Sequence, residues 1–159
     1  MEIEMKYLVK KIDFNIHSYK NNQIIQGYIS LDPEIRIRNI GDKYFVTEKS
    51  TGDLIRKEKE YQITKRDFLN KSKQIISNLI KKRRYYIPIL DGFIAELDIY
   101  ELELDGLITV EVEFNDLKLV NNFMAPEWFG KSITYDKKYK NKNLSKLNKE
   151  KIKNGKVID

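Results

Sequence analysis

Residues 2–6 read EIEMK, a stretch with a charged side chain at every second position. Glu2, Glu4 and Lys6 alternate with Ile3 and Met5, so in a β-strand the charges share one face and the apolar groups share the other. In a single strand of an ordinary sheet, the apolar face packs on the core and the charged face meets water. The inner face can be the charged one only if other strands repeat the pattern.

The pattern recurs in five further strand-like segments. Charged residues two positions apart occur at Arg36 and Arg38, Glu58 and Glu60, Lys82 and Arg84, Glu96 and Asp98, and Glu111 and Glu113. Several residues between these pairs, such as Ile37, Leu97 and Val112, are apolar and need to be covered. If helices cover them from outside, the charged faces point into a closed barrel, whose interior can hold one small ligand.

Turn and capping signals divide the chain into strands and a few helices. Strand-like runs lie at 1–9, 24–31, 34–40, 43–50, 55–63, 82–89, 93–101 and 107–114, and turn signals such as Gly41-Asp42 separate several of them. Thr64 and Asp67 form a capping pattern at the start of a helix predicted over 65–80. Two more helices are predicted at 116–124 and, Lys-rich, at about 136–150. The predicted fold is α+β and mainly antiparallel β, an eight-stranded closed β-barrel with helices packed outside.

The composition indicates one folded domain in a reducing compartment. The chain has 159 residues, of which 41% are hydrophobic, enough to bury a core. It has no cysteine, which excludes disulfides and thiolate metal sites and fits the cytoplasm. No apolar run approaches the length of a membrane span, so we expect a cytoplasmic protein without a membrane partner.

The net charge of +6 comes from one end of the chain. Residues 1–130 carry 20 basic and 21 acidic side chains, whereas residues 131–159 carry 10 basic and 3 acidic ones. A near-neutral body makes binding of nucleic acid by the whole fold unlikely. We expect a single domain over 1–147, followed by a mobile Lys-rich tail over 148–159.

The inward faces would combine two kinds of charged group. The carboxylates are Glu2, Glu4, Glu58, Glu60, Glu96, Asp98, Glu111 and Glu113, and the cations are Lys6, Arg36, Arg38, Lys49, Arg56, Lys82 and Arg84. Oxygen-only ligand sets select hard cations such as Mg²⁺ or Mn²⁺, and arginine and lysine clusters bind phosphate oxygens. Together they indicate a metal-dependent site for a small polyphosphate.

These segments resemble a known family. EIEMK is similar to the ExExK signature of the CYTH superfamily, the triphosphate tunnel metalloenzymes. The resemblance continues through QGYIS (26–30), IRIRN (35–39), KYFVTEKS (43–50), RKEKE (56–60), KKRRY (81–85), AELDIY (95–100), VEVEF (110–114) and EWFGKSITYDKKYKNKNL (127–144). The ordered combination is more specific than ExExK alone. It implies an eight-stranded tunnel that binds a triphosphate lengthwise.

The resemblance also implies roles for the inward residues. Glu2, Glu4, Glu111 and Glu113 would be metal ligands, with Glu58 and Glu60 sharing a metal site or its water shell. Lys6, Arg36, Arg38, Lys49, Lys82 and Arg84 would bind phosphate oxygens, with Arg56 as a weaker member of this set. Lys6 and Tyr28 together would orient or deprotonate the attacking water. Glu96 and Asp98 would either bind metal or balance the charge of the tunnel.

Several activities fit such a tunnel. The compact size and the WFG segment favour hydrolysis of inorganic triphosphate with Mg²⁺ or Mn²⁺, and nucleoside triphosphates or polyphosphate are further substrates. A class IV adenylyl cyclase and a thiamine triphosphatase are the alternative enzymes. A module that binds polyphosphate without cleaving it is the non-enzymatic alternative. A homodimer is possible if apolar strand faces stay uncovered.

Overall fold

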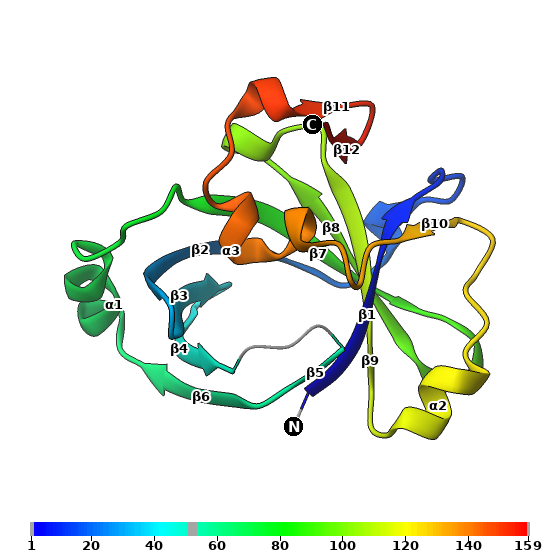
Figure 1. Cartoon of the computed structure of the whole chain (residues 1–159), viewed down its shortest axis with the longest axis horizontal. Helices are drawn as coiled ribbons and strands as arrows, with labels where there is room; N and C mark the ends of the chain where they lie inside the picture. The colour runs from blue at the N-terminus through cyan, green and yellow to red at the C-terminus, as the bar shows by residue number, and fades with distance from the viewer. Residues whose placement is uncertain (1, 51–53, 159) are drawn as a thin grey trace.

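The computed structural model describes residues 2–50 and 54–158, and ten strands of this part of the chain form one antiparallel sheet that curves into a barrel (Figure 1). Nothing is described for the predicted turn at 51–53 or for the side chain of Glu2, which lie outside the described residues. The strands of the sheet are β1 (Glu2–Val9), β2 (Asn21–Leu31), β3 (Glu34–Ile40), β4 (Lys43–Lys49), β5 (Ile55–Arg56), β6 (Glu58–Ile63), β7 (Ile80–Pro88), β8 (Ile94–Tyr100), β9 (Ile108–Phe114) and β10 (Phe129–Ser132).

The barrel closes through the segment that the sequence predicts as one strand over 55–63. Neighbouring strands run in the order β10, β1, β9, β8, β7, β2, β3, β4 and β6, and β5 pairs with the start of β1 on the side away from β9. At the break between β5 and β6, Lys57 donates its backbone N–H to Ser50 Oγ over 2.8 Å and accepts from the Ser50 N–H over 2.9 Å. The predicted eight-stranded barrel is confirmed, with its eighth strand split into β5 and β6.

The apolar faces of β1, β8 and β9 point out of the barrel into a covered core. Ile3, Leu97 and Val112 are buried there. The cover consists of α2 (Leu117–Asn122), β10 and neighbouring aromatic side chains, which lie outside the barrel (Figure 1). The ring centroids of Phe114 and Phe123 are 5.2 Å apart. Because this face is buried outside, the alternating charged face must line the interior.

The helix predicted over 65–80 was wrong beyond residue 72. The cap is as expected, since Thr64 Oγ1 accepts the backbone N–H of Asp67 over 3.1 Å, but α1 ends after Lys65–Ser72. The chain then runs along β2, where the Ile76 N–H donates to the Tyr28 carbonyl over 2.9 Å and the Tyr28 N–H donates to Ser77 Oγ over 3.0 Å. Pairing of β2 with β7 ends at Gln26, so this segment supplies the backbone partners that Tyr28 needs there.

The C-terminal segment also differs from its prediction. Instead of one helix over 136–150, it has a 3₁₀ turn at Lys137–Tyr139, the four-residue α3 (Asn141–Leu144) and a second 3₁₀ turn at Lys149–Lys151. The hairpin of β11 (Ile152–Lys153) and β12 (Lys156–Val157) follows, and Val157 is only 6% exposed. Val157 and, in part, Ile152 therefore pack against the molecule within the stretch that the sequence predicts as a solvated tail, whereas Lys149–Lys151 are exposed. Apolar contacts of Tyr139, Leu144 and Val157 account for the difference.

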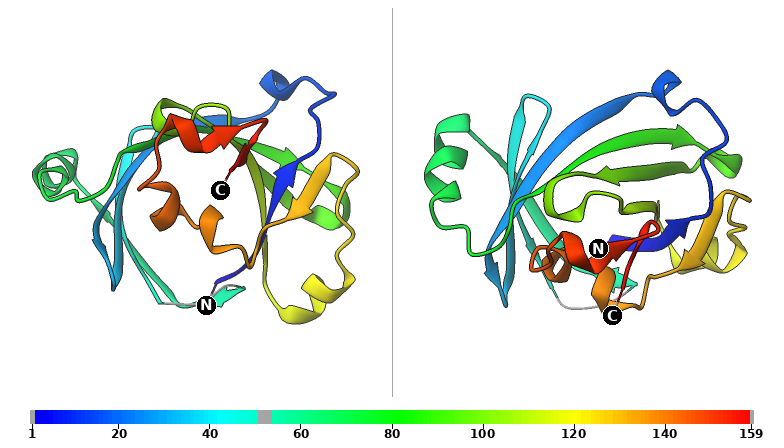
Figure 2. Two further views of the ribbon diagram at one scale, coloured as in Figure 1. Left: turned by 45° about the horizontal axis from the view of Figure 1, so that its top comes forward. Right: turned by 90° about the horizontal axis from the view of Figure 1, so that it is seen from above.

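This segment lies across one opening of the barrel. Figure 2 shows α3 and the turn before it in front of the opening, with the β11–β12 hairpin next to them. Within 2–50 and 54–158, the helices are too short or too polar for any of them to cross a bilayer.

Candidate active site in the barrel interior

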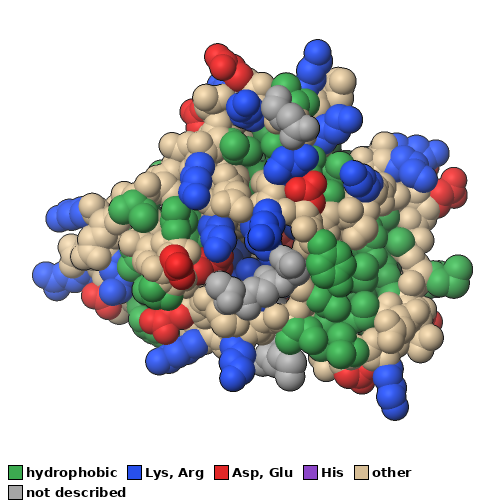
Figure 3. Space-filling model, in the orientation of Figure 1, with side chains coloured by type: hydrophobic (Ala, Val, Ile, Leu, Met, Phe, Trp, Pro, Cys, Tyr) green, Lys and Arg blue, Asp and Glu red, His purple; other side chains and the backbone are tan. Residues whose placement is uncertain are grey.

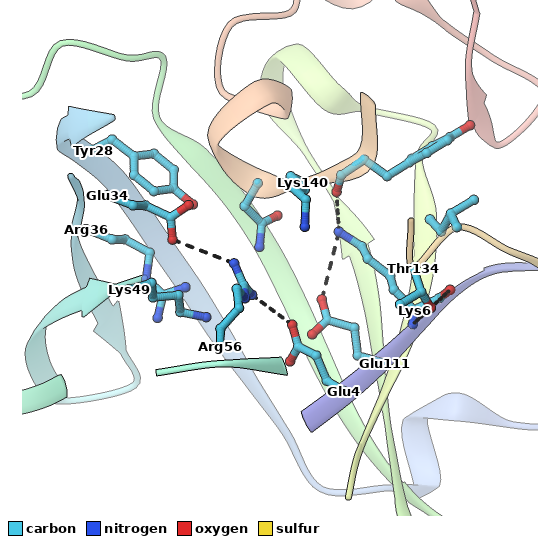
Figure 4. Close-up of a pocket in the computed structure, with 13 residues that line it drawn as sticks. Glu4, Lys6, Tyr28, Glu34, Arg36, Lys49, Arg56, Glu111, Thr134 and Lys140 are labelled. Atoms are coloured by element: carbon cyan, nitrogen blue, oxygen red, sulfur yellow. Dashed lines mark hydrogen bonds and ion pairs between the residues drawn. The ribbon is translucent and has the colours of Figure 1, made fainter. Parts of the chain in front are cut away.

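Three adjoining polar pockets, which form three parts of one polar cavity region, lie in the barrel interior and at its opening. The wide chamber has a volume of about 470 Å³ and lies between the acidic and basic strands. A neck of about 40 Å³ shares lining residues with this chamber and with an outer pocket of about 520 Å³ beside α3. Lys49 lines all three parts, and Figure 4 shows the residues of the neck.

One wall of the wide chamber carries carboxylates from adjacent strands. Register places Glu4 of β1 opposite Glu113 of β9, and Glu111 of β9 opposite Glu96 of β8. All four line the chamber, together with Glu58 and Glu60 of β6. Like charges directly opposite each other destabilise a sheet. This wall would therefore be stabilised by a cation bound between its carboxylates.

The facing wall carries arginines held by neutral partners. Arg36 and Arg38 of β3 are 3% and 8% exposed and line the chamber with Lys49 of β4 and Arg84 of β7. Arg36 donates from Nη2 to Thr47 Oγ1 over 3.2 Å, and Arg38 donates from Nε to Gln26 Oε1 over 2.9 Å. Burial lowers the pKa of Arg38 to about 10, so its guanidinium is still charged at neutral pH.

The Arg36 guanidinium keeps hydrogen-bonding capacity for a ligand. Its buried Nε has no hydrogen-bond partner among the described residues. A buried N–H without an acceptor is unfavourable, and an anion in the chamber would satisfy it. This wall has the donors that phosphate oxygens require.

Lys6 lies in the neck between the carboxylate wall and the C-terminal segment. Its Nζ donates to the Tyr139 carbonyl over 2.5 Å and lies 3.9 Å from Glu111 Oε1 (Figure 4). Burial lowers the pKa of Lys6, and Glu111 opposes this shift. Burial alone would raise the pKa of Glu111, but Lys6, Arg84 and Lys82 outweigh it and bring this pKa to about 2.

Arg56 spans the neck toward two carboxylates. Its Nη2 lies 3.0 Å from Glu4 Oε1, and its Nη1 lies 3.9 Å from Glu34 Oε2. Tyr28 lines the same neck beside Glu34, and burial raises the pKa of its hydroxyl. Figure 4 shows Tyr28 on the wall across from Lys6, whose described contacts are Tyr139 and Glu111. The structure brings Lys6 and Tyr28 into one neck but not into contact.

Lys82, Arg84 and Asp98 form a separate closed cluster. Arg84 donates from Nε to Asp98 Oδ1 over 2.8 Å and from Nη2 to Asp98 Oδ2 over 2.9 Å, and Lys82 Nζ lies 2.7 Å from Asp98 Oδ2. Lys82 and Asp98 are fully buried and, unlike Arg84, line none of the three parts of the cavity. Lys82 was expected to bind phosphate, and Asp98 either to bind metal or to balance the charge of the tunnel. In the structure Lys82 pairs with Asp98, which matches the charge-balancing role of Asp98.

The pKa values of this cluster follow from burial and pairing. Burial lowers the pKa of Lys82 to about 7, although Asp98 acts in the opposite direction. Burial would raise the pKa of Asp98, but Arg84 and Lys82 hold it well below its usual range. Because Arg84 also lies 3.1 Å from Glu96 Oε2, the cluster connects to the chamber through Arg84.

The donor chemistry of the chamber fits a hard divalent cation bound together with phosphate. Six glutamates line it. Among the described residues, however, no three acidic or histidine side chains converge on a preformed metal position. Mg²⁺ takes few protein carboxylates and completes its shell with water and substrate phosphates. Glu4, Glu111 and Glu113 are placed to supply those carboxylates.

The sequence missed several residues that line the neck. Glu34 extends the pattern of Arg36 and Arg38 by one more step of two, so the alternation contained a signal for it. Thr134, Tyr139 and Asn141 come from the C-terminal segment, where no periodic pattern indicates an inward side chain. Asn141 also reaches the wide chamber, and its Oδ1 accepts from the Tyr100 hydroxyl over 3.3 Å.

Comparison with known proteins gives relatives over nearly the whole chain, although no family model matches it. The chain is 38% identical over 148 residues to an inorganic triphosphatase of Nitrosomonas europaea, covering 91% of this chain and 96% of that one. It is 34% identical over 153 residues to an inorganic triphosphatase of Acetivibrio thermocellus, covering 91% and 93%.

Solved structures give the same result. A crystal structure of an inorganic triphosphatase matches with a TM-score of 0.68 and 35% identity, over 91% of this chain and 94% of that chain. A candidate adenylyl cyclase from Hippeastrum matches with a TM-score of 0.54 and 16% identity, over 76% and 83%, and this likeness concerns the fold alone.

Proposed function

The chain belongs to the inorganic triphosphatases of the CYTH superfamily, and on that premise we propose that it hydrolyses inorganic triphosphate in the wide chamber with a bound divalent cation. The observation that carries the proposal is the division of the chamber into two walls. Glu4 and Glu113 face each other in register on one wall, and the buried arginines of β3 lie on the other. A strongly anionic triphosphate with its cation matches both walls.

The phosphates that do not react are bound by the basic wall. Arg36 and Arg38 donate to their oxygens, Arg36 through its unpartnered Nε among other groups. The carboxylates of Glu4, Glu111 and Glu113 would hold the divalent cation, Mg²⁺ or Mn²⁺, which would neutralise charge on the phosphate oxygens. Positioning and charge neutralisation provide most of the rate in such reactions.

Lys6 and Tyr28 act on the water from two sides of the neck. The water oxygen forms a bond to the terminal phosphorus while the bond to the bridging oxygen breaks, and pyrophosphate leaves. Lys6 orients the water from the carboxylate wall. The raised pKa of Tyr28 keeps its hydroxyl neutral, so Tyr28 serves as a hydrogen-bond donor to the water or to a phosphate oxygen.

Finer expectations concern the preferred substrate, the cellular location and the oligomeric state. We expect nucleoside triphosphates and longer polyphosphate to be cleaved more slowly than inorganic triphosphate. The cyclase and thiamine triphosphatase alternatives predict ATP or thiamine triphosphate as the best substrate. The absence of cysteine favours a cytoplasmic location, and a homodimer would cover apolar residues such as Ile55 and Met124, which are 39% and 86% exposed. Figure 3 shows a hydrophobic area on the face of the molecule that Figure 1 presents.

Phosphate release tests the proposal. Inorganic triphosphate, ATP and thiamine triphosphate are offered with Mg²⁺ or Mn²⁺ and with chelator, to the wild type and to the Glu4→Ala protein. Turnover strongest on inorganic triphosphate, lost with chelator and lost in the variant, is the expected result. No release from folded protein would contradict it. Binding of triphosphate without release, seen as a raised melting temperature, would favour the binding module instead.

A further inference from the structure

The C-terminal segment holds Lys6 at three points. The Lys6 backbone N–H donates to Thr134 Oγ1 over 2.9 Å, and its carbonyl accepts from the Ile133 N–H over 2.8 Å. The third point is the side chain, where Nζ donates to the Tyr139 carbonyl over 2.5 Å. The first two contacts fix the strand. The direction of the ammonium group is set by the Tyr139 carbonyl, the closer contact, together with Glu111 Oε1 at 3.9 Å.

Tyr139 is fixed in turn by the end of the chain. Its side chain is buried, and its hydroxyl accepts the backbone N–H of Val157 over 3.0 Å and lies 3.5 Å from the Val157 carbonyl oxygen. Val157 is buried in β12 and pairs with Ile152 of β11. The hairpin lies next to the turn that contains Tyr139 (Figure 1). A continuous series of contacts therefore connects Val157, Tyr139 and Lys6.

This anchoring is needed because neither partner is rigid alone. The turn Lys137–Tyr139 has three residues, and so short a 3₁₀ turn is not stable without tertiary contacts. A lysine side chain has four rotatable bonds and loses much conformational freedom when its ammonium group is held. Contacts that hold the Tyr139 peptide order the Lys6 side chain when the protein folds. Substrate binding then does not have to supply this loss of conformational entropy.

We propose that Tyr139 is a positioning residue for Lys6 and that the β11–β12 hairpin is its anchor. The inference rests on the proposed function, because it assigns Lys6 to the attacking water. The segment that the sequence predicts as a solvated tail then has a role in the site: its backbone, through the Tyr139 hydroxyl, sets the position of a lysine more than a hundred residues away in sequence.

Tyr139→Phe removes the hydroxyl and keeps the ring. We expect kcat on inorganic triphosphate to fall roughly tenfold with KM changed less than about twofold, because small misplacements of reacting groups are costly. Tyr135→Phe is the matched control, since Tyr135 lies on the same segment and is 63% exposed. It should keep wild-type kinetics. A Tyr139→Phe protein that matches the wild type, or exceeds it, would overturn the proposal.

A double-mutant cycle separates positioning from general stability. In a Lys6→Met background, Tyr139→Phe should lower the residual kcat by less than about twofold, because its effect acts through Lys6. An equal fold-loss in both backgrounds would show that Tyr139 acts on the fold rather than on Lys6.

A labelling experiment without substrate keeps this test independent of the proposed activity. Acetylation of the Lys6 amine is followed by peptide mass spectrometry in the wild type, Tyr139→Phe, Tyr135→Phe and a chain ending at Lys151. We expect several-fold faster labelling in Tyr139→Phe and in the shortened chain, and no change in Tyr135→Phe. If the wild type fails to cleave triphosphate but labelling follows this order, the proposed function fails and the anchoring stands.

Labelling of Lys6 at the wild-type rate in Tyr139→Phe would refute the anchoring. If the shortened chain does not melt cooperatively, the Tyr139→Phe comparison alone decides.

Discussion

The barrel interior contains two groups of charged residues that differ in how far they open to the wide chamber. In the Lys82–Arg84–Asp98 cluster, one carboxylate receives three close contacts of 2.7 to 2.9 Å and is fully buried. On the wall formed by β1 and β9, Glu4 lies opposite Glu113, a like charge, and both face a chamber of about 470 Å³. Both groups arise from the same alternation in sequence.

This difference in access to the chamber indicates which inward-facing charged residues can contact a ligand. Buried charges are tolerated when they are paired, and removal of one partner leaves the other unsatisfied. The closed cluster meets that condition within the protein, so it supports the barrel and holds Arg84 toward the chamber. The open wall carries like charges in register and faces the chamber, so a cation and its phosphate ligand bound there would stabilise it. The predictions below test this division, from the largest expected effect to the smallest.

Asp98→Asn should cost the most stability. It leaves Lys82 and Arg84 buried without their carboxylate, and we expect the free energy of unfolding to fall by about 3–5 kcal/mol. Urea denaturation followed by circular dichroism measures the change. Asp42→Asn, at an exposed turn, is the matched control and should stay within about 0.5 kcal/mol of the wild type. An Asp98→Asn protein of normal stability would remove the distinction between the two groups.

Glu113→Gln should lower activity strongly and leave stability unchanged, the reverse of Asp98→Asn. Glu113 is exposed to the chamber and faces Glu4, so removal of its charge should lower kcat/KM for triphosphate about 100-fold by weakening cation binding. The melting temperature should not fall, because the change also removes a like-charge pair. Steady-state kinetics and a thermal melt on the same sample give both values. Unchanged kinetics would mean that this wall does not act in turnover.

Arg36→Lys tests whether the basic wall binds substrate through the geometry of the guanidinium group as well as through its charge. A lysine keeps the charge but cannot reproduce the planar fork of donors, so we expect KM to rise roughly tenfold with little change in kcat. Arg66→Lys on the exposed face of α1 is the control and should leave both constants unchanged. A KM unaffected by Arg36→Lys would indicate that Arg36 does not bind substrate.

The last test measures the pH dependence of stability that arises from the closed cluster, rather than the effect of a substitution at one pH. The pKa of Lys82 is about 7 in the folded protein and 10.5 ordinarily, so between these values the unfolded chain binds the extra proton. Stability should therefore rise with pH across this window, by at most about 1.4 kcal/mol per pH unit, and be flat below it. Lys82→Met should lack this rise. Denaturation at several pH values from 7 to 10 measures the slope, and equal slopes in the two proteins would refute the assignment.

The sequence predicted the barrel because its signal is local and repeated. Alternation in β1, β3 and β9 depends only on the two-residue period of a strand. The outward apolar residues of β1 and β9 are covered in the outer core, and Ile37 of β3 is buried as well. The same period cannot say which inward charges pair with each other. Lys82 and Arg84 follow the pattern that Arg36 and Arg38 follow, yet only the register of β7 with β8 brings Arg84 opposite Asp98.

The errors lie where tertiary contacts override local signals. Ile75, Ile76 and Leu79 have helical spacing. This segment instead lies along β2, where it forms hydrogen bonds with the backbone N–H and carbonyl of Tyr28. The C-terminal residues have few apolar positions, so nothing local indicated that Val157 would be buried or that Tyr139 would contact Lys6. The part of the site that comes from residues 133–141 could not be predicted from periodicity.

A crystal structure with Mn²⁺ and inorganic imidotriphosphate, whose P–N–P bridges resist hydrolysis, would test the division of the interior most directly. The account predicts an anomalous manganese peak between the Glu4, Glu111 and Glu113 carboxylates, phosphate oxygens on Arg36 and Arg38, and an unchanged Lys82–Asp98 pair. A manganese ion on Asp98, or a ligand bound outside the wide chamber, would contradict it.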